Sequence, residues 1–169
     1  MTQLLLTAFA SVLLGLYSLR VQNVTLTRQN ELTATEASET ATAIAQEMIE
    51  EISVRRFDQR WSAPGQFQYD STKFTSADSL GRDAGEAADS VQNFSDVDDF
   101  KGYSVSKATP HIGSFAVSCN VYYVLEDAPD VQINHQSFLK RLDVKVKNPF
   151  VMSPDSSVTM SKVISYRFK

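Results

Sequence analysis

The side chains best suited to chemistry in this sequence are the carboxylates of an acidic stretch beyond its middle. They gather at Asp83, Glu86, Asp89, Asp96, Asp98 and Asp99. Such hard oxygen donors are the ligands that Ca²⁺ prefers, but their spacing is not that of an EF-hand loop. We therefore expect a solvated acidic loop that needs no ion, with Asp96, Asp98 and Asp99 as weak candidates for metal ligands.

Other reactive side chains are few. No Cys or Ser stands in a recognisable nucleophile motif near His111 or His135, so we expect no catalytic site and no cofactor. Cys119, the single cysteine, cannot form an internal disulfide, and no Cys/His spacing resembles a zinc site. It falls on the apolar side of an alternating segment, where a small buried hydrophobe is expected.

Composition limits the class of protein. The 169 residues, 43% of them hydrophobic, suffice for one domain with an appendage. Acidic residues outnumber basic ones by 20 to 16, the net charge is -4, and no stretch of Lys or Arg forms a basic stripe. We therefore expect no nucleic-acid partner.

The chain opens with an apolar block, "MTQLLLTAFASVLLGLYSLRVQ", whose first basic residue is Arg20. A cleaved secretory signal would carry basic residues before its apolar core and small residues at a cut site, and neither flank is convincing. A buried helix of a small domain would need cover on every side. The third interpretation is a helix that sits first in a membrane and later against copies of itself.

No proline occurs before Pro64, and Gly15 is the only glycine up to that point, so a helix can run on from the apolar block. Apolar side chains then recur at helical spacing at Ala37, Ala41, Ile44, Ala45, Met48, Ile49 and Ile52. The pattern predicts one helix over about residues 2–55, on the order of 80 Å long. Its half at 1–28 is expected to project, and its amphipathic half at 29–55 to belong to a globular domain at 29–169.

Beyond the helix, residues 57–112 show turn signals and no dominant period, which predicts a loop-rich region. Residues 113–169 alternate with period two, which is typical of strands with one apolar face. The predicted inward positions are Phe115, Val117, Cys119, Val121 and Tyr123, then Leu142, Val144 and Val146, then Val158, Met160, Ile164, Tyr166 and Phe168, interrupted by Lys162. We predict an α+β fold in which residues 29–55 pack on an antiparallel sheet of three to four strands.

This layout resembles that of type IV pilin-like proteins. The segments "AIAQEMIEEISVRRFD" at 43–58 and "FSDVDDFKGYS" at 94–104 are similar to stretches of the minor-pilin and pseudopilin branch. The resemblance implies removal of a leader that ends in glycine, a mature chain that begins at Met1, and a stay in the cytoplasmic membrane before assembly into a filament. One departure is Leu5, because the family usually has glutamate at the fifth position to pair with a neighbour's amine. Gln3 and Thr2 are the nearest polar groups that could accept from that amine.

The resemblance implies a structural subunit of an extracellular cell-surface filament, with itself or other pilin-like subunits as partners and no enzymatic role. The expected assembly residues are Met1, Leu4, Leu5, Leu6, Phe9, Val12, Leu13, Leu16 and Leu19. Two alternatives stay open. One is a minor pilin or pseudopilin of a type II secretion-like machine, and the other is a membrane-tethered exported domain whose loop at 62–112 binds a ligand.

Overall fold

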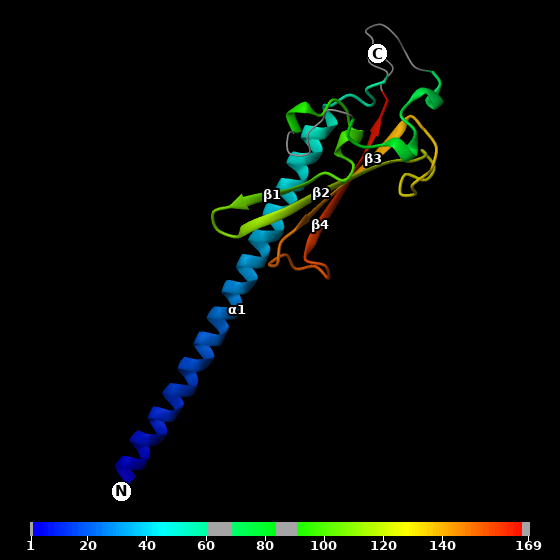
Figure 1. Cartoon of the computed structure of the whole chain (residues 1–169). Coiled ribbons are helices and arrows are strands. Elements are labelled where there is room, and N and C mark those ends of the chain that lie inside the picture. The colour runs from blue at the N-terminus through cyan, green and yellow to red at the C-terminus, as the bar shows by residue number, and fades with distance from the viewer. Residues whose placement is uncertain (1, 61–68, 84–90, 167–169) are drawn as a thin grey trace.

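The computed structural model describes residues 2–60, 69–83 and 91–166, apart from the side chains at positions 4, 5 and 7. Within these ranges the chain has an α+β fold, in which one long helix packs on a four-stranded antiparallel sheet (Figure 1). The predicted fold class is confirmed. Met1, Glu86, Asp89 and Phe168 lie outside the described residues.

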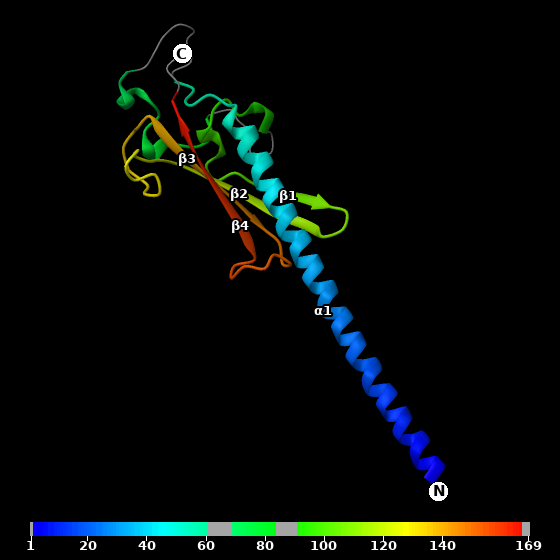
Figure 2. The ribbon, with the colours of Figure 1, turned by 180° about the vertical axis from the view of Figure 1, so that it is seen from behind.

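Helix α1 spans Thr2–Ser53, within two residues of the predicted C-terminal end. Its C-terminal part lies along the sheet and its N-terminal part extends away from the domain, as both views show (Figures 1 and 2). Burial begins at Ala34 and continues along the predicted stripe from Ala37 to Ile52. The helix ends where the Arg55 amide donates to the Ile52 carbonyl at 3.0 Å, which closes a tighter final turn.

The sheet is a simple meander in the order β1-β2-β3-β4, with every neighbouring pair antiparallel. Its strands are β1 (Ser104–Thr109), β2 (Gly113–Tyr123), β3 (Leu139–Lys147) and β4 (Ser157–Ser165). In the middle of the sheet, Cys119 of β2 lies opposite Val144 of β3, which lies opposite Met160 of β4. These residues belong to the core between sheet and helix. The predicted apolar faces of β2 and β3 are therefore confirmed.

Strand β1 corrects the expectation that residues 57–112 are loop-rich and that the sheet starts at 113. Its segment "SVSKAT" contains too few apolar side chains to produce a clear alternating signal. It becomes a strand because the edge of β2 that β3 does not use pairs with it along its whole length, from Ser104 opposite Ser118 to Thr109 opposite Gly113. Tertiary pairing here overrides a weak local preference.

The rest of the region between helix and sheet folds into four short 3-10 turns among the described residues: η1 (Ser71–Lys73), η2 (Ala77–Ser79), η3 (Val91–Asn93) and η4 (Asp98–Phe100). A second apolar cluster of Phe57, Phe74, Leu80 and Tyr123 forms there, beside the end of β2. Phe57 and Phe74 meet edge to face, with ring centroids 5.1 Å apart. This cluster fixes the segment that follows α1 against the sheet.

Candidate functional site

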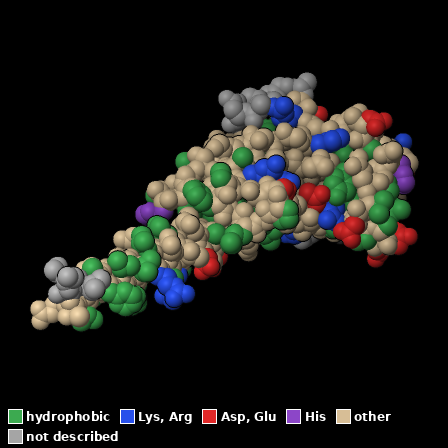
Figure 3. Space-filling model, turned by 90° about the horizontal axis from the view of Figure 1, so that it is seen from below, with side chains coloured by type: hydrophobic (Ala, Val, Ile, Leu, Met, Phe, Trp, Pro, Cys, Tyr) green, Lys and Arg blue, Asp and Glu red, His purple; other side chains and the backbone are tan. Residues whose placement is uncertain are grey.

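The projecting half of α1 carries most of the exposed large hydrophobic side chains in the described part of the chain. Every described side chain from position 2 to position 32 is exposed, including Leu6 at 68% and Phe9 at 64%. Hydrophobic side chains lie along this rod, among polar ones, in the space-filling view (Figure 3). Exposed apolar surface of this extent marks an interaction site. Burying one such Leu or Phe side chain contributes about 2 kcal/mol.

The predicted assembly residues that the structure describes all lie on this rod and are exposed: Leu6, Phe9, Val12, Leu13, Leu16 and Leu19. Met1 and the side chains of Leu4 and Leu5 lie outside the described residues. The exposed assembly residues form a broad stripe along the helix rather than converging on a pocket. Such a surface suits contact with several neighbours or with a nonpolar medium, not the capture of a small ligand. In the described residues, no helix has the length and hydropathy needed to span a membrane.

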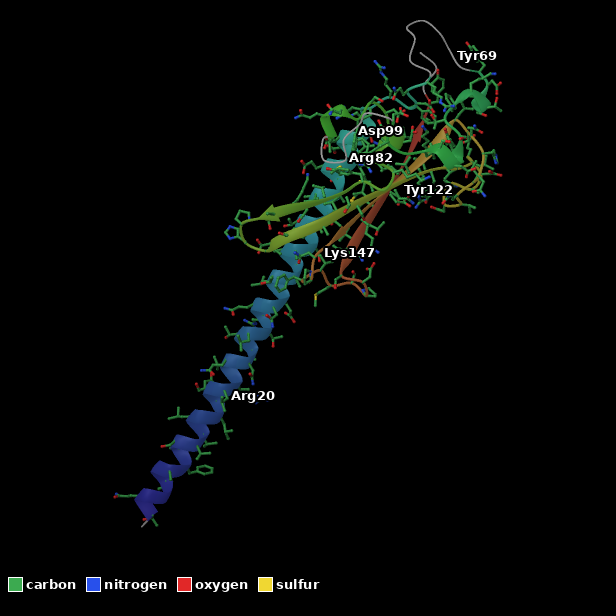
Figure 4. All side chains as sticks on the ribbon, viewed as in Figure 1. Arg20, Tyr69, Arg82, Asp99, Tyr122 and Lys147 are labelled. Atoms are coloured by element: carbon green, nitrogen blue, oxygen red, sulfur yellow. The ribbon has the colours of Figure 1, made fainter. Side chains whose placement is uncertain are left out.

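Asp83 is exposed, as expected of a solvated loop, but Asp96, Asp98 and Asp99 contradict that expectation. Asp96 and Asp99 are each 1% exposed, and Asp98 is buried with them. Their carboxylates are used locally: Asp96 Oδ1 accepts from the Asp98 amide at 2.9 Å, and Asp99 Oδ2 accepts from the Ser95 amide at 2.7 Å. Asp99 lies beside the C-terminal part of α1, close to the segment that leaves the helix (Figure 4). Sequence alone could not show this, because a loop acquires burial only from the elements packed around it.

Asp96 joins the acidic segment to the chain that leaves α1. Its Oδ2 accepts from the Gln59 amide at 2.6 Å, and the Val97 amide donates to the Arg56 carbonyl at 3.0 Å. Arg55 adds two further bonds, from its guanidinium to the carbonyls of Phe94 at 3.1 Å and Val91 at 3.3 Å. Arg55 therefore links the end of the helix to the acidic segment.

Lys140 of β3 is the residue that sequence reasoning missed. It is 0% exposed, and its Nζ lies 2.6 Å from Asp98 Oδ1, 2.6 Å from the Phe57 carbonyl oxygen and 3.5 Å from Asp58 Oδ2. The ammonium also lies over the ring of Phe57, 4.6 Å from its centroid. Its burial could have been inferred from the alternation of the strand, because Lys140 lies on the same face as Leu142, Val144 and Val146.

Asp58 completes the buried polar cluster, which we define as Asp58, Asp96, Asp98, Asp99 and Lys140. Its two carboxylate oxygens accept from the amides of Thr75 at 2.7 Å and Arg60 at 3.0 Å. The cluster places the carboxylates of Asp98 and Asp58 against one buried ammonium, while Asp96 and Asp99 accept from backbone amides of the adjoining segments. Burial, with the neighbouring Asp98 adding to it, raises the pKa of Asp96 to about 8.

These contacts describe a structural network rather than a reactive centre. In the described residues, no group of three or more His, Cys, Asp or Glu side chains is placed to hold a metal ion. His111 and His135 are both exposed. Cys119 is buried as predicted, and burial raises the pKa of its thiol to about 12, which keeps it protonated and inert at neutral pH.

No protein-family model, curated protein or solved structure matches this chain. The exposed apolar rod is the candidate functional surface, and the buried polar cluster supports the domain beside it.

Proposed function

We propose that this protein is a structural subunit of an extracellular filament of the type IV pilin-like class, which polymerises through the projecting half of α1. The observation that carries the proposal is the rod itself: apolar side chains from Leu6 to Leu26 are exposed around a helix that its own domain does not cover. Packing this surface against copies of the same helix removes it from water. The chain supplies the scaffold of the filament and performs no catalysis.

Two features of the globular domain support assembly through the helix. The domain has a complete core without the rod, because the buried residues of α1 begin at Ala34. Both edges of the sheet also carry a lysine on the side that faces the helix: Lys107 of β1, which pairs with Glu47 at 3.0 Å, and Lys162 of β4. Inward-pointing charge on an edge strand hinders pairing with another sheet. The sheet edges are therefore poor assembly surfaces, whereas the rod is a good one.

Replacing Leu13 with aspartate tests the proposal. The change places an unpaired charge between packed helices, which costs several kcal/mol per subunit and repeats along the polymer. We expect Leu13→Asp to abolish filaments in electron micrographs of sheared cell-surface material, while the domain keeps its melting temperature. Leu13→Met, which keeps the surface apolar, is the matched control and should assemble normally.

Normal filaments from Leu13→Asp would show that this helix is not the filament core. Wild-type chains that stay monomeric in the membrane fraction would favour the tethered binding domain instead. Filaments that form only when other subunits of this class are present would assign the chain to a minor pilin or pseudopilin.

A further inference from the structure

Arg20, the first charged residue of α1, needs an acidic partner in any polymer that buries this helix. Arg20 stands between the exposed apolar residues Leu19 and Val21, on the projecting part of α1 and away from the sheet (Figure 4). No acidic residue precedes Glu31 in the chain. Glu31 lies about 16 Å further along the same helix, beyond the reach of an arginine side chain. When helices pack around Arg20, its guanidinium therefore needs an acid from another copy.

The spacing of charges along α1 provides such acids. Arg20 and Glu31 are 11 residues apart, and so are Arg28 and Glu39. All four side chains are exposed, and none belongs to an ion pair among the described residues. Eleven residues are close to three full helical turns, or about 16 Å. A parallel neighbour displaced by that length brings acids to both arginines at once.

Other arrangements fit the charges or the apolar surface less well. Parallel copies without displacement set Arg20 against Arg20 and Arg28 against Arg28. Within α1, whose acids are Glu31, Glu36, Glu39, Glu47, Glu50 and Glu51, the only other displacement that serves both arginines is 19 residues. It requires Glu47, which already pairs with Lys107 at 3.0 Å, and it lays the apolar residues 2–19 against the polar residues 21–38.

An antiparallel pair also brings acids to both arginines, with Arg20 beside Glu39 and Arg28 beside Glu31. It lays residues 2–19 against residues 40–57 of the other copy. The exposed side chains there include Thr42, Gln46 and Glu50, which give an apolar rod no nonpolar cover. The parallel displacement of 11 residues instead sets residues 2–19 against residues 13–30, where Leu16, Leu19 and Leu26 are exposed.

We infer that neighbouring copies of this chain pack their α1 helices in parallel with a displacement of 11 residues, so that Arg20 and Arg28 of one copy pair with Glu31 and Glu39 of the next. This inference rests on the proposed function, because it specifies the contact by which the rods assemble. The partner is a second copy of the chain, recognised through charge complementarity above a shared apolar surface.

Charge reversal in the full-length chain tests the pairing. The double variants Arg20→Glu with Arg28→Glu, and Glu31→Arg with Glu39→Arg, set like charges against each other at every contact. Each should lower the yield of sedimentable filaments at least about tenfold. The four changes together restore opposite charges and should recover the wild-type yield within about twofold. Glu36→Arg, an exposed change on the same helix that meets neither arginine, is the control.

Disulfide cross-links between introduced cysteines measure the displacement directly. The native Cys119 does not interfere because it is buried. Val21→Cys with Leu32→Cys reports 11 residues in parallel, Val21→Cys with Thr40→Cys reports 19, and Val21→Cys with Ser38→Cys reports the antiparallel pair. When filaments of these cysteine variants are oxidised, we expect a ladder of cross-linked multimers from the first pair only.

A ladder from the second pair, dimers from the third, or no cross-link in intact filaments would overturn the inference and leave the proposed function standing. The inference would also be overturned if each double charge reversal abolished filaments and the quadruple reversal failed to restore them. Absence of filaments from the wild-type chain itself would refute the proposed function, and the inference with it.

Discussion

Lys140 is the residue on which the buried polar cluster depends. Its ammonium holds Asp98 at 2.6 Å and the Phe57 carbonyl at 2.6 Å, with Asp58 at 3.5 Å, and so joins β3 to the segment after α1 and to the acidic segment. Removing one partner of a buried ion pair leaves uncompensated charge in a nonpolar setting. The contacts of the Lys140 ammonium therefore hold the domain together near the end of α1, and few other side chains could make them.

We expect Lys140→Met to destabilise the domain by about 3–5 kcal/mol, because Asp58 and Asp98 lose their cation while the packed volume is nearly kept. The matched control is Lys145→Met. Lys145 pairs with Asp155 on the surface, where an ion pair contributes less than about 1 kcal/mol. Urea unfolding of both variants measures the difference, and equal losses would show that the cluster contributes no more than a surface pair.

Asp96 makes the stability of the domain depend on pH. Burial raises its pKa to about 8 in the folded state, above the ordinary value near 4, so the folded chain binds this proton more tightly than the unfolded chain. The stability contributed by the protonated form is complete below about pH 4 and is lost as pH rises through about 8. We expect the melting temperature to fall by at least about 2 °C between pH 5 and pH 8.

Asp96→Asn removes this titration, so its melting temperature should vary less over the same range, whatever its absolute value. Parallel curves for the variant and the wild type would mean that another group produces the pH dependence.

The same carboxylates lead us to expect that the fold tolerates a chelator. Asp96, Asp98 and one oxygen of Asp99 already accept hydrogen bonds from backbone amides or from Lys140. Asp99 Oδ1 is buried without a hydrogen-bond partner, but a single oxygen does not supply the roughly six to eight ligands that Ca²⁺ takes. Melting curves with EDTA and with millimolar Ca²⁺ should agree within about 1 °C, since a ligand that does not bind shifts no equilibrium. A rise of several degrees with Ca²⁺, lost in Asp98→Ala, would refute this expectation.

At the scale of elements, the two edge strands explain why the sheet does not itself associate. β1 and β4 are the outer strands of the meander, and each carries a lysine on the helix side of the sheet, half-buried at Lys107 and exposed at Lys162. Lys162 stands opposite Leu142, in line with the core positions Met160 and Ile164. A charge at such a position makes edge-to-edge pairing costly.

Lys162→Ile should therefore increase aggregation of the domain, measured as light scattering at high protein concentration. Lys147→Ile is the matched control, because Lys147 is exposed at the end of the interior strand β3. It adds the same apolar side chain without altering an edge. Equal scattering from both variants would show that added hydrophobicity, not loss of an edge charge, is responsible.

At the scale of the whole molecule, α1 serves two roles along one uninterrupted helix. From Ala34 onward it completes the core beneath the sheet, and the described side chains up to position 32 are exposed. Helical stability in the second part comes from tertiary packing, whereas the first part has only its own backbone bonds and whatever neighbours it meets. The two parts should be separable.

A truncated protein that begins at Gln29 should be soluble, monomeric and folded, with a melting temperature within about 3 °C of that of the full-length domain, since it keeps every buried residue of α1. Size-exclusion chromatography and circular dichroism measure these properties. Aggregation or unfolding of the truncated protein would mean that the apolar half belongs to the core of the domain.

The long helix, its two halves and the inward faces of β2 and β3 could be predicted from the sequence because each depends on local periodicity. Helical spacing from Ala37 to Ile52, the lack of proline and the alternation around Cys119 are properties of neighbouring residues. Strand β1 could not be predicted in this way, because its pairing with β2 compensates for a weak pattern.

The buried polar cluster was decided by tertiary structure alone. Asp58, Asp96, Asp98 and Lys140 lie in three separate segments. The three aspartates resemble ordinary surface residues when their segments are considered alone, whereas Lys140 shares the apolar face of its strand but has no partner within it. Only when the end of α1, the acidic segment and β3 pack together does burial turn these charges into partners, because a buried charge requires a counter-charge that a solvated one does not. The sequence by itself determined which surfaces are apolar, and the fold decided which charges are removed from water.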